Sequence, residues 1–294
     1  MFRNWYIREY GLEKREISVI MSVYNSEKYL SEAIESVLNQ SFSNFEFLIT
    51  NDCSTDNSYI LLEKYSKIDS RIKILNNKHN IGLTKSLNKM VKLSKGKYIA
   101  RMDSDDICRE DRFEKELELI KKSNADVVFS NCEIIDSHSN KVCNAWKPND
   151  VNKILKNINY INYIPHPSVL LNKQSLIDMD FYNENCKTGQ DKELWKRMIN
   201  ANKIFQFINL PLLKYRLNPK SVRNIRSSDE NYDLAKICIV NRDKKNGIKY
   251  MKLIKSKKSR IDIFIRILVP CVLFKLIVNS RAHSNSLRKA KTIK

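Results

Sequence analysis

The 294-residue sequence is poor in glycine and lacks several motifs that would define common protein classes. Only five glycines occur, and neither a G-x-G-x-x-G fingerprint nor a Walker loop is present, which argues against a dinucleotide or ATP site. The seven cysteines form no C-x-x-C pair, so neither a disulfide framework nor a zinc cage is indicated, and we expect a reducing compartment.

Long apolar runs are also missing. No stretch reaches the roughly 20 apolar residues of a spanning helix. The nearest approach, residues 261–278, is interrupted by Asp262, Arg266, Pro270 and Lys275. Residues 1–16 contain no apolar core, so no secretory signal is expected.

Positive charge is abundant and unevenly distributed. Residues 241–294 hold 16 Lys and Arg against 2 Asp and Glu, a net of +14 out of the chain's +20, so the first 240 residues carry only +6. A segment of this kind binds nucleic acid, binds an anionic membrane, or stays solvated. With 42% apolar residues overall, the pattern indicates an ordinary globular domain followed by a basic tail.

Short apolar runs alternate with helical patterns along the first 130 residues. Strands are predicted at 17–23, 45–50, 71–75, 98–102 and 127–130, and helices at 25–39, 58–66, 83–93 and 113–122. This alternation is typical of right-handed βαβ units and a mostly parallel sheet flanked by helices. Further on, we expect a helix at 191–201, strands at 204–208 and 213–217, and helical basic sequence after residue 227.

Two acidic clusters follow predicted strands. Asp52 and Asp56 follow the second strand, and Asp103, Asp105 and Asp106 follow the fourth. Ligands of such sheets bind beyond the carboxyl ends of the strands, so both clusters should meet at one edge. Carboxylates this close repel unless a cation neutralises them, and oxygen ligands suit Mg²⁺ or Mn²⁺. The alternative is a solvated acidic turn that caps the next helix, because a D-x-D alone is weak evidence.

Taken together, the motifs resemble those of family 2 glycosyltransferases, which have the nucleotide-sugar-binding GT-A fold. The matching segments run from about residue 17 to 223: ISVIMSVYNSEKYLSEAIESVLNQSF, FLITNDCSTDNS, NIGLTKSLN, GKYIARMDSDDICREDRF, IPHPSV, GQDKELWKRM and LLKYRLNPKSV. The resemblance implies an α/β, Rossmann-like GT-A domain at 17–225, with a nucleotide-sugar-binding half at 17–131 and an acceptor-binding half at 132–225. Residues 1–16 would be an N-terminal extension, and 226–294 a basic, partly apolar helical tail.

The same resemblance implies a donor site in the first half. The loop after the first strand would lie against the base, Asp52 would hydrogen-bond uracil, and Asp103 would lie near the ribose. The implied nucleotide-sugar-binding residues are Tyr24, Asn25, Glu27, Asp52, Gly82 and Asp103. Asp105 falls at the metal-ligand position, for Mn²⁺ or Mg²⁺, and Asp106 at one that caps or orients its neighbours. For Asp56, capping the next helix is at least as good an interpretation as ligand contact.

In the second half, Asp191 falls at the position of the family's catalytic base. A positioned carboxylate there could take the proton of an acceptor hydroxyl during a direct displacement that inverts the anomeric centre. The alternative for Asp191 is the N-cap of its helix. Three further residues are assigned to the acceptor or diphosphate region. For His166 the favoured alternative is a structural loop residue, and for Trp195 it is a core residue. Arg216, together with Arg223, could supply positive charge in place of the missing histidine.

Five positions depart from the family pattern. Ser22 replaces a frequent Pro, Cys53 a Gly, Leu87 an Arg, Gln190 a Glu and Asn218 a His. If the turn at residue 53 requires a positive φ, the cysteine is strained there.

The implied function is transfer of a sugar from a nucleotide-diphosphate donor to a hydroxyl of a glycan or a polyprenyl-diphosphate-linked acceptor, in O-antigen, capsule or lipopolysaccharide assembly. UDP is favoured because Asp52 matches the uracil-contacting position. The tail would dock on the anionic cytoplasmic face of the inner membrane, or else form short helices packed on the domain.

Three other classes stay open at this point. They are a catalytically impaired sugar-nucleotide-binding scaffold, a retaining transferase on a similar fold, and a basic nucleic-acid-binding protein. For the last, no recognised motif is present and no nucleic acid is expected.

Overall fold

The computed structural model describes residues 15–145, 148–186, 188–217, 235, 238–239 and 241–268. The chain divides into two compact units, one made of residues up to Glu133 together with Lys147–Arg216, the other of Ile134–Trp146 and the residues from Leu217 onward. Most of the predicted N-terminal extension, the boundary near residue 225, Asn218, Arg223 and the tail after residue 268 lie outside the described residues.

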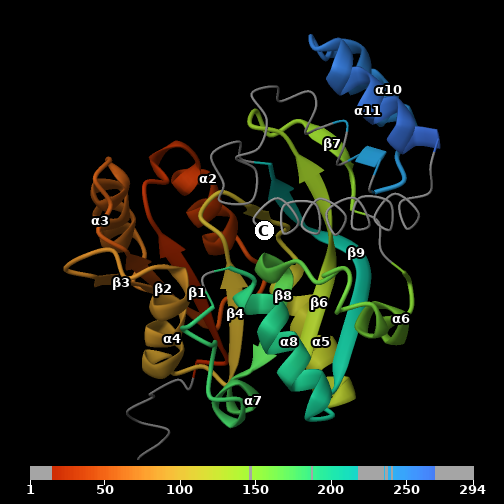
Figure 1. Ribbon diagram of the computed structural model, residues 1–294. Coiled ribbons are helices and arrows are strands. Elements are labelled where there is room, and N and C mark those ends of the chain that lie inside the picture. The colour runs from red at the N-terminus through yellow and green to blue at the C-terminus, as the bar shows by residue number, and fades with distance from the viewer. Residues whose placement is uncertain are drawn as a thin grey trace, which may run out of the picture. The chain divides into compact units, whose positions relative to one another are not determined.

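The first unit begins with four parallel strands, as the alternating pattern predicts (Figure 1). Strand β1 (Ile17–Val23) lies between β2 (Phe45–Asn51) and β4 (Tyr98–Met102), and β3 (Ile72–Asn76) lies beside β2. These strands form where β-branched and apolar residues run together, and β1, β2 and β4 are buried almost throughout.

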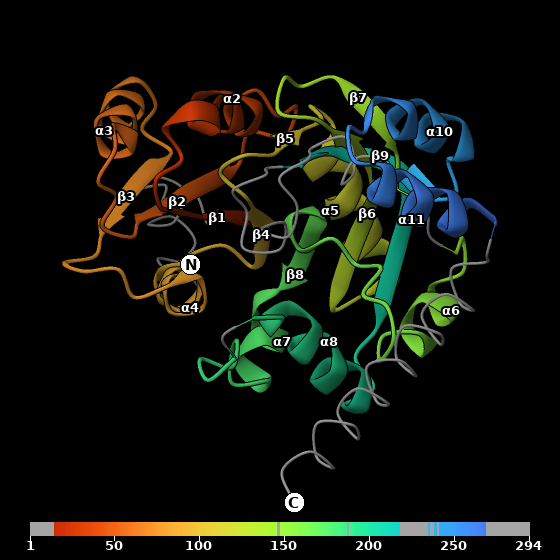
Figure 2. The same ribbon diagram turned by 45° about the horizontal axis from the view of Figure 1, so that its top comes forward.

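Helices cover both faces of this parallel part. Helices α2 (Glu27–Leu38) and α3 (Ser58–Ile68) lie on one face, and α4 (Leu83–Leu93) lies on the other (Figure 2). Each buries residues three or four positions apart, which is the spacing of one helix face. The register pairs Val23 with Asn51 and Met21 with Met102. The loops that follow these strands therefore emerge at one edge of the sheet.

Beyond β4 the sheet changes direction. Strand β8 (Val169–Asn172) pairs antiparallel with both β4 and β6 (Val127–Ile135). Next in order come β9 (Phe205–Arg216) and β5 (Ile107–Cys108), which pair antiparallel with each other, and β7 (Lys141–Asn144) pairs with β6. The expectation of a mostly parallel sheet thus holds for the first half of the fold, and the whole sheet is mixed. After the short 3₁₀ turn η1 (His166–Ser168), β8 starts beside the end of β4, because Leu170 pairs with Ala100 and Asn172 with Tyr98, and the two strands therefore run in opposite directions.

Among the remaining helices, those at Arg112–Ser123 and Gln190–Asn200 match predicted ones, those at Val151–Lys156 and Lys173–Asp178 were not predicted, and the break expected between two strands is absent. The helices are α5 (Arg112–Ser123), α6 (Val151–Lys156), α7 (Lys173–Asp178), α8 (Gln190–Asn200), α10 (Lys244–Leu253) and α11 (Lys257–Leu268). The strands expected at 204–208 and 213–217 form the single strand β9. The chain stays extended through Pro211, whose fixed φ is compatible with a strand. Among the described helices, none combines the length and apolar character that a membrane crossing requires.

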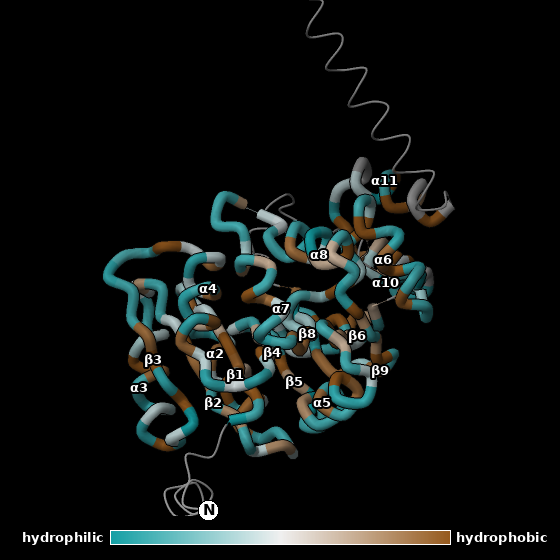
Figure 3. Tube along the Cα trace, turned by 90° about the horizontal axis from the view of Figure 1, so that it is seen from below, coloured by the Kyte–Doolittle hydropathy of each residue, from teal (hydrophilic) through white to brown (hydrophobic). Residues whose placement is uncertain are grey.

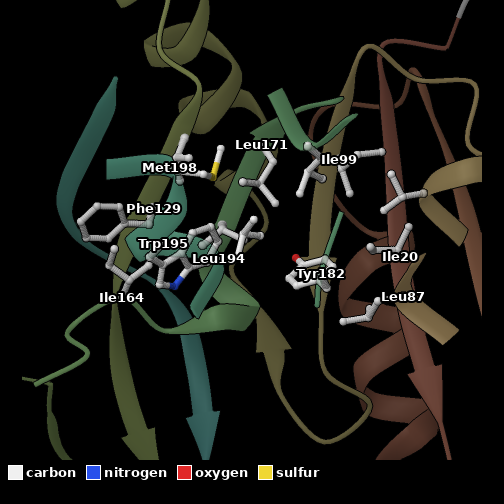
Figure 4. Packing of buried hydrophobic residues seen from close by; sticks show 14 of the residues in the cluster. Ile20, Leu87, Ile99, Phe129, Ile164, Leu171, Tyr182, Leu194, Trp195 and Met198 are labelled. Carbon is white, nitrogen blue, oxygen red and sulfur yellow. The ribbon is translucent and has the colours of Figure 1, made fainter. Parts of the chain in front are cut away.

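On the face of the sheet covered by α4, strands and helices of the first unit share an apolar core that includes α7 and α8. The trace is largely hydrophobic along the central strands and largely hydrophilic in the peripheral loops (Figure 3). Leu194, Trp195 and Met198 of α8 pack with Phe129 and Leu171 of the sheet (Figure 4). Burying each such side chain contributes roughly 1.5–3 kcal/mol. This packing fixes α8, and with it the position of Asp191 in the first turn of that helix.

Candidate active site

The loop after β1 is joined to the loop after β2 by side-chain hydrogen bonds. Asn25 has a φ of +50°, which asparagine tolerates better than most residues. Its Oδ1 accepts from the backbone N–H of Thr55 at 2.8 Å, and its own N–H donates to Ser54 Oγ at 3.2 Å. The neighbouring Tyr24 is half exposed. Asn25 thus shapes the loop, and Tyr24 offers an accessible ring at the edge of the sheet.

Glu27 and Asp56 tie together the starts of α2 and α3. The N–H of Glu27 donates to Asp56 Oδ2 at 3.1 Å, and the N–H of Asn57 donates to Glu27 Oε2 at 3.0 Å. Asp56 Oδ1 also accepts from the N–H of Ser58, the first residue of α3, at 3.0 Å. Burial acts to raise the pKa of Asp56, but these donated hydrogen bonds outweigh it and the pKa is lowered. The N-cap of α3 is Asn57, so Asp56 is not the cap itself but accepts the first helical N–H from one residue before it.

Asp52 holds the segment that leads into α4. The side chain is buried, with Oδ1 accepting from Asn77 Nδ2 at 2.8 Å and from the N–H of Ile81 at 2.9 Å. Its Oδ2 accepts from the N–H of Gly82 at 2.8 Å. Gly82 has a φ of +87°, a conformation that favours glycine. A carboxylate has about four acceptor sites, so a nucleotide base could still donate to Asp52 Oδ2.

The cysteine that follows Asp52 has the strained backbone that the sequence suggested. Cys53 has a φ of +63°, so the turn does require the left-handed conformation. Its thiol lies 3.8 Å from the carbonyl oxygen of Lys78, which is a weak contact. The turn keeps its shape at the cost of a non-glycine residue in this region, roughly 1–2 kcal/mol.

The three carboxylates after β4 form one cluster. Ligand oxygens of Asp103, Asp105 and Asp106 all lie within 4.8 Å of one another. Asp103 forms an ion pair with the buried Arg101. Ser104 Oγ lies 2.8 Å from Ser26 Oγ, which connects the cluster to the loop after β1.

Asp106 is the buried member of this cluster. Its Oδ1 accepts from the backbone N–H of Arg216 at 2.8 Å, whereas Oδ2 is buried and finds no hydrogen-bond partner among the described residues. Burial first, and then the neighbouring carboxylates Asp103 and Asp105, raise the pKa of Asp106 well above its ordinary value. A hard divalent cation such as Mn²⁺ or Mg²⁺ fits this donor set, because it would offset the repulsion among the three groups.

Arg216 lies directly behind the cluster at the end of β9. Its side chain is almost completely buried, and its guanidinium forms an ion pair with Glu32 of α2. The charge that we expected to be available for a diphosphate is thus engaged within the protein. The companion residue Arg223 lies outside the described residues.

Asp191 occupies the first turn of α8, but it is not the N-cap. The N-cap is Gly189, with a φ of +72°, so the capping alternative is wrong. Asp191 is buried, and its Oδ2 accepts from Asn162 Nδ2 at 2.8 Å. Asn162 is held in turn, since its Oδ1 accepts from the N–H of Ile164 at 3.1 Å. A carboxylate at this end of a helix is stabilised by the helix dipole.

Two aromatic contacts decide between the alternatives for His166 and Trp195. Trp195 is completely buried, edge-to-face with His166 at 6.1 Å and with Phe205 at 6.2 Å. Its assignment to the acceptor pocket is therefore wrong, because no ring face is exposed for a sugar. His166 is also buried, with Nε2 lying 2.9 Å from Tyr182 Oη. This placement agrees with a structural role for His166. Leu87, at the position of the missing arginine, is a core residue.

Sequence reasoning missed Tyr182, a buried residue whose hydroxyl lies 2.9 Å from His166 Nε2. Asn88 of α4 holds its backbone, donating to the Tyr182 carbonyl at 2.9 Å and accepting from its N–H at 3.0 Å. Burial raises the pKa of the phenol, the charge of Arg101 lowers it and that of Asp191 raises it. Tyr182 thus lies within electrostatic reach of the arginine that pairs with Asp103 and of Asp191. Arg101 could have been singled out from the sequence, because it is a charged residue inside the otherwise apolar strand YIARM.

Comparison with known proteins identifies the class to which this fold and site belong. Residues 18–178, a little more than half of the chain, match the family model described as Glycosyl transferase family 2. The chain belongs to this family, and by class it is a glycosyltransferase. The parallel half of the sheet and the acidic loop after β4 both lie within the matched residues.

Two relatives and one solved structure illustrate the similarity. WfgD of Escherichia coli, a UDP-Glc:alpha-D-GlcNAc-diphosphoundecaprenol beta-1,3-glucosyltransferase, is 33% identical over 210 residues, which is 70% of this chain and 79% of that protein. The O-antigen biosynthesis glycosyltransferase WbnJ of Escherichia coli is 32% identical over 213 residues, 70% of this chain and 82% of that protein. S. aureus TarS 1-349 in complex with UDP-GlcNAc has a TM-score of 0.59 at 21% identity, covering 86% of this chain and 71% of that one, a likeness of fold.

Proposed function

We propose that this protein is an inverting, metal-assisted glycosyltransferase that moves a sugar from a UDP-sugar to a hydroxyl of a glycan or polyprenyl-diphosphate-linked acceptor in bacterial surface-polysaccharide assembly. The observation that carries the proposal is the carboxylate cluster Asp103, Asp105 and Asp106, with a buried Asp106 oxygen that lacks a hydrogen-bond partner among the described residues. Asp191, buried in the first turn of α8 and held by Asn162, supports a second carboxylate on the acceptor side of the site.

In this proposal Asp191 is the catalytic base. It takes the proton of the acceptor hydroxyl as that oxygen bonds to the anomeric carbon and the bond to the diphosphate oxygen breaks. The hydrogen bond from Asn162 Nδ2 holds the Asp191 carboxylate in one orientation. Asp105, with Asp103 and Asp106 beside it, would hold Mn²⁺ or Mg²⁺, which supplies positive charge for the departing diphosphate. Inversion is supported by the name of WfgD, since UDP-glucose carries an α-linked sugar and that product is β-linked.

A uridine donor is supported by two observations. TarS, with the same fold, was crystallised with UDP-GlcNAc, and WfgD uses UDP-Glc by name. In this proposal the base and ribose lie against Tyr24, Asn25, Asp52 and Gly82, and Asp103 lies near the ribose. Asp52 retains acceptor capacity for a uracil N–H.

The second unit supports docking on an anionic membrane surface. Its helices α10 and α11 expose Ile248, Leu253, Ile261 and Phe264, in a segment rich in lysine and arginine. Along α11 hydrophilic and hydrophobic residues alternate (Figure 3). Exposed apolar side chains among positive charges favour the boundary of an anionic bilayer. In this proposal the protein acts at the cytoplasmic face of the inner membrane, where a polyprenyl-linked acceptor would be presented.

A donor screen tests the proposal. The full-length protein would be mixed with Mn²⁺ and a panel of UDP-, GDP- and dTDP-sugars, and binding and slow donor hydrolysis would be followed. We expect one UDP-sugar to bind only with metal, and Asp105→Ala to abolish binding. Asp191→Asn should keep donor binding while transfer falls roughly 100- to 10,000-fold. A folded protein that binds no donor would instead favour the impaired scaffold, and the strain at Cys53 would become the first suspect.

Membrane docking is tested separately by sedimentation with vesicles. We expect the protein to pellet with vesicles rich in anionic lipid and to be released by salt. A version that ends before residue 244 should stay in the supernatant, and pelleting of that version would contradict the proposal. A salt-sensitive shift of RNA or DNA in a gel would point to the nucleic-acid-binding class instead.

A further inference from the structure

Arg216 contacts the carboxylate cluster through both its side chain and its main chain. Arg216 is the last residue of β9 and of the first compact unit. Its Nε donates to the backbone carbonyl of Asp105 at 2.7 Å, and its own backbone N–H donates to Asp106 Oδ1 at 2.8 Å. Arg216 therefore holds two successive members of the carboxylate cluster. Its side chain binds the main chain of Asp105, and its main chain binds the side chain of Asp106.

The other side of the guanidinium is held by α2. Nη2 forms an ion pair with Glu32 Oε2 at 2.5 Å, and the guanidinium carbon lies 4.3 Å from the centre of the Tyr29 ring. The Arg216 side chain is 1% exposed and that of Glu32 is 42% exposed. A guanidinium with a carboxylate, a carbonyl and a ring face around it has a single orientation.

We propose that Glu32 and Arg216 form a positioning pair for the loop that carries Asp103, Asp105 and Asp106, here called the metal loop. In this proposal Arg216 is not a ligand of the diphosphate. This inference rests on the proposed function. Glu32 holds the guanidinium, the guanidinium holds the Asp105 carbonyl, and the direction of the Asp105 carboxylate follows from the position of its main chain. The positive charge of Arg216 is then balanced inside the protein, and the diphosphate charge is left to the metal.

Partners that orient a metal ligand in this indirect way usually change metal affinity roughly 10- to 100-fold when they are removed. The test therefore measures Mn²⁺ binding, through loss of the EPR signal of free Mn²⁺ at saturating UDP, in the full-length protein. Calorimetry would measure UDP and UMP binding at saturating Mn²⁺. We expect Arg216→Met and Glu32→Ala each to weaken Mn²⁺ binding about tenfold or more. The affinity ratio of UDP to UMP should stay within twofold of the wild-type value.

Two further variants sharpen the comparison. Arg216→Lys should recover only part of the Mn²⁺ affinity. An ammonium group lacks the planar, fixed set of N–H donors with which the guanidinium binds both the Asp105 carbonyl and the Glu32 carboxylate. The double variant Arg216→Met/Glu32→Ala should bind Mn²⁺ no more weakly than the weaker of the two single variants, since both substitutions remove the same contact. Arg71→Met is the matched control. Arg71 also binds a carboxylate (Asp69, 2.7 Å) and a carbonyl (Leu38, 2.9 Å) and stacks on a ring (Phe45, 4.4 Å), but it does not touch the carboxylate cluster.

The outcomes separate the alternatives. If Arg216→Met loses UDP affinity but not UMP affinity, while Glu32→Ala binds UDP as well as or better than the wild type, Arg216 is a diphosphate ligand and the inference is wrong. Unchanged Mn²⁺ binding in a folded Glu32→Ala would also overturn it, and the exposure of Glu32 makes that variant safe for folding. A wild-type protein that binds neither Mn²⁺ nor UDP would defeat the proposed function itself, before any variant is compared.

Discussion

A buried ion pair within α5 offers a sharp test of what stabilises this fold. Arg112 and Glu116 of α5 are both completely buried, with Nε lying 3.1 Å from the carboxylate. Arg112 Nη2 also donates to the carbonyls of Arg101 and Val169, at 3.1 and 3.2 Å, which joins β4 to β8. Replacing Arg112 by Met keeps most of the volume, but it leaves a buried carboxylate and two carbonyls without their partner.

The size of the effect follows from the environment of Glu116. Removing one partner of a buried pair costs about 3–5 kcal/mol, so we expect Arg112→Met to lower the free energy of unfolding by that amount at pH 8. Burial raises the pKa of Glu116 to about 7, more than the attraction of Arg112 lowers it. Because this pKa is raised on folding, the stabilisation from Glu116 is complete below its unfolded pKa of 4.5 and is lost as the pH rises through about 7.

The cost of Arg112→Met should therefore shrink in acid. At pH 5 the carboxyl holds its proton in the folded protein, and mainly the lost hydrogen bonds to the carbonyls count, about 1–3 kcal/mol. Urea unfolding followed by tryptophan fluorescence measures both values, since Trp195 is buried in the same unit. The double variant Arg112→Met/Glu116→Leu should recover most of the loss at pH 8. A cost below about 1 kcal/mol at pH 8, or one that does not change with pH, would refute the reasoning.

Three other substitutions have definite expected outcomes. Cys53→Gly should raise the free energy of unfolding by about 1 kcal/mol in urea melts, because it relieves the positive φ; a loss of stability would show that the cysteine is not strained. Gly96→Ala should lower it by about 1–3 kcal/mol, since the new Cβ would lie 2.4 Å from the backbone nitrogen of Ser18, and an unchanged melting curve would contradict this. Asn162→Ala should reduce kcat for transfer about tenfold with donor affinity unchanged, because it removes a hydrogen bond to the Asp191 carboxylate; equal turnover would remove Asn162 from the site.

Much of the first half of the fold was predictable from the sequence. Strands β1 and β4 and helix α4 have the bounds that the pattern of apolar residues predicted. Such patterns are local, because a strand or helix face is visible within about ten residues of sequence. The convergence of Asp52 and Asp103 at one edge also followed, since parallel strands carry their carboxyl ends to the same side.

The backbone of the turn at residue 53 was predictable for a similar reason. A cysteine at a glycine position indicated a strained backbone, and the positive φ is present. The charge of the tail could likewise be counted from the sequence, whereas the residues after 268 lie outside the described part of the chain.

Tertiary structure alone decided the rest. The antiparallel half of the sheet joins strands far apart in the chain, and no local pattern shows that β8 enters between β4 and β6. The same holds for Glu32 and Arg216, which are 184 residues apart, and for Asn88 and Tyr182, which are 94 residues apart. Residue types indicate which chemistry is available, but burial and partners decide whether a charge faces a ligand or another side chain. Arg216 is the residue for which that difference changed the interpretation.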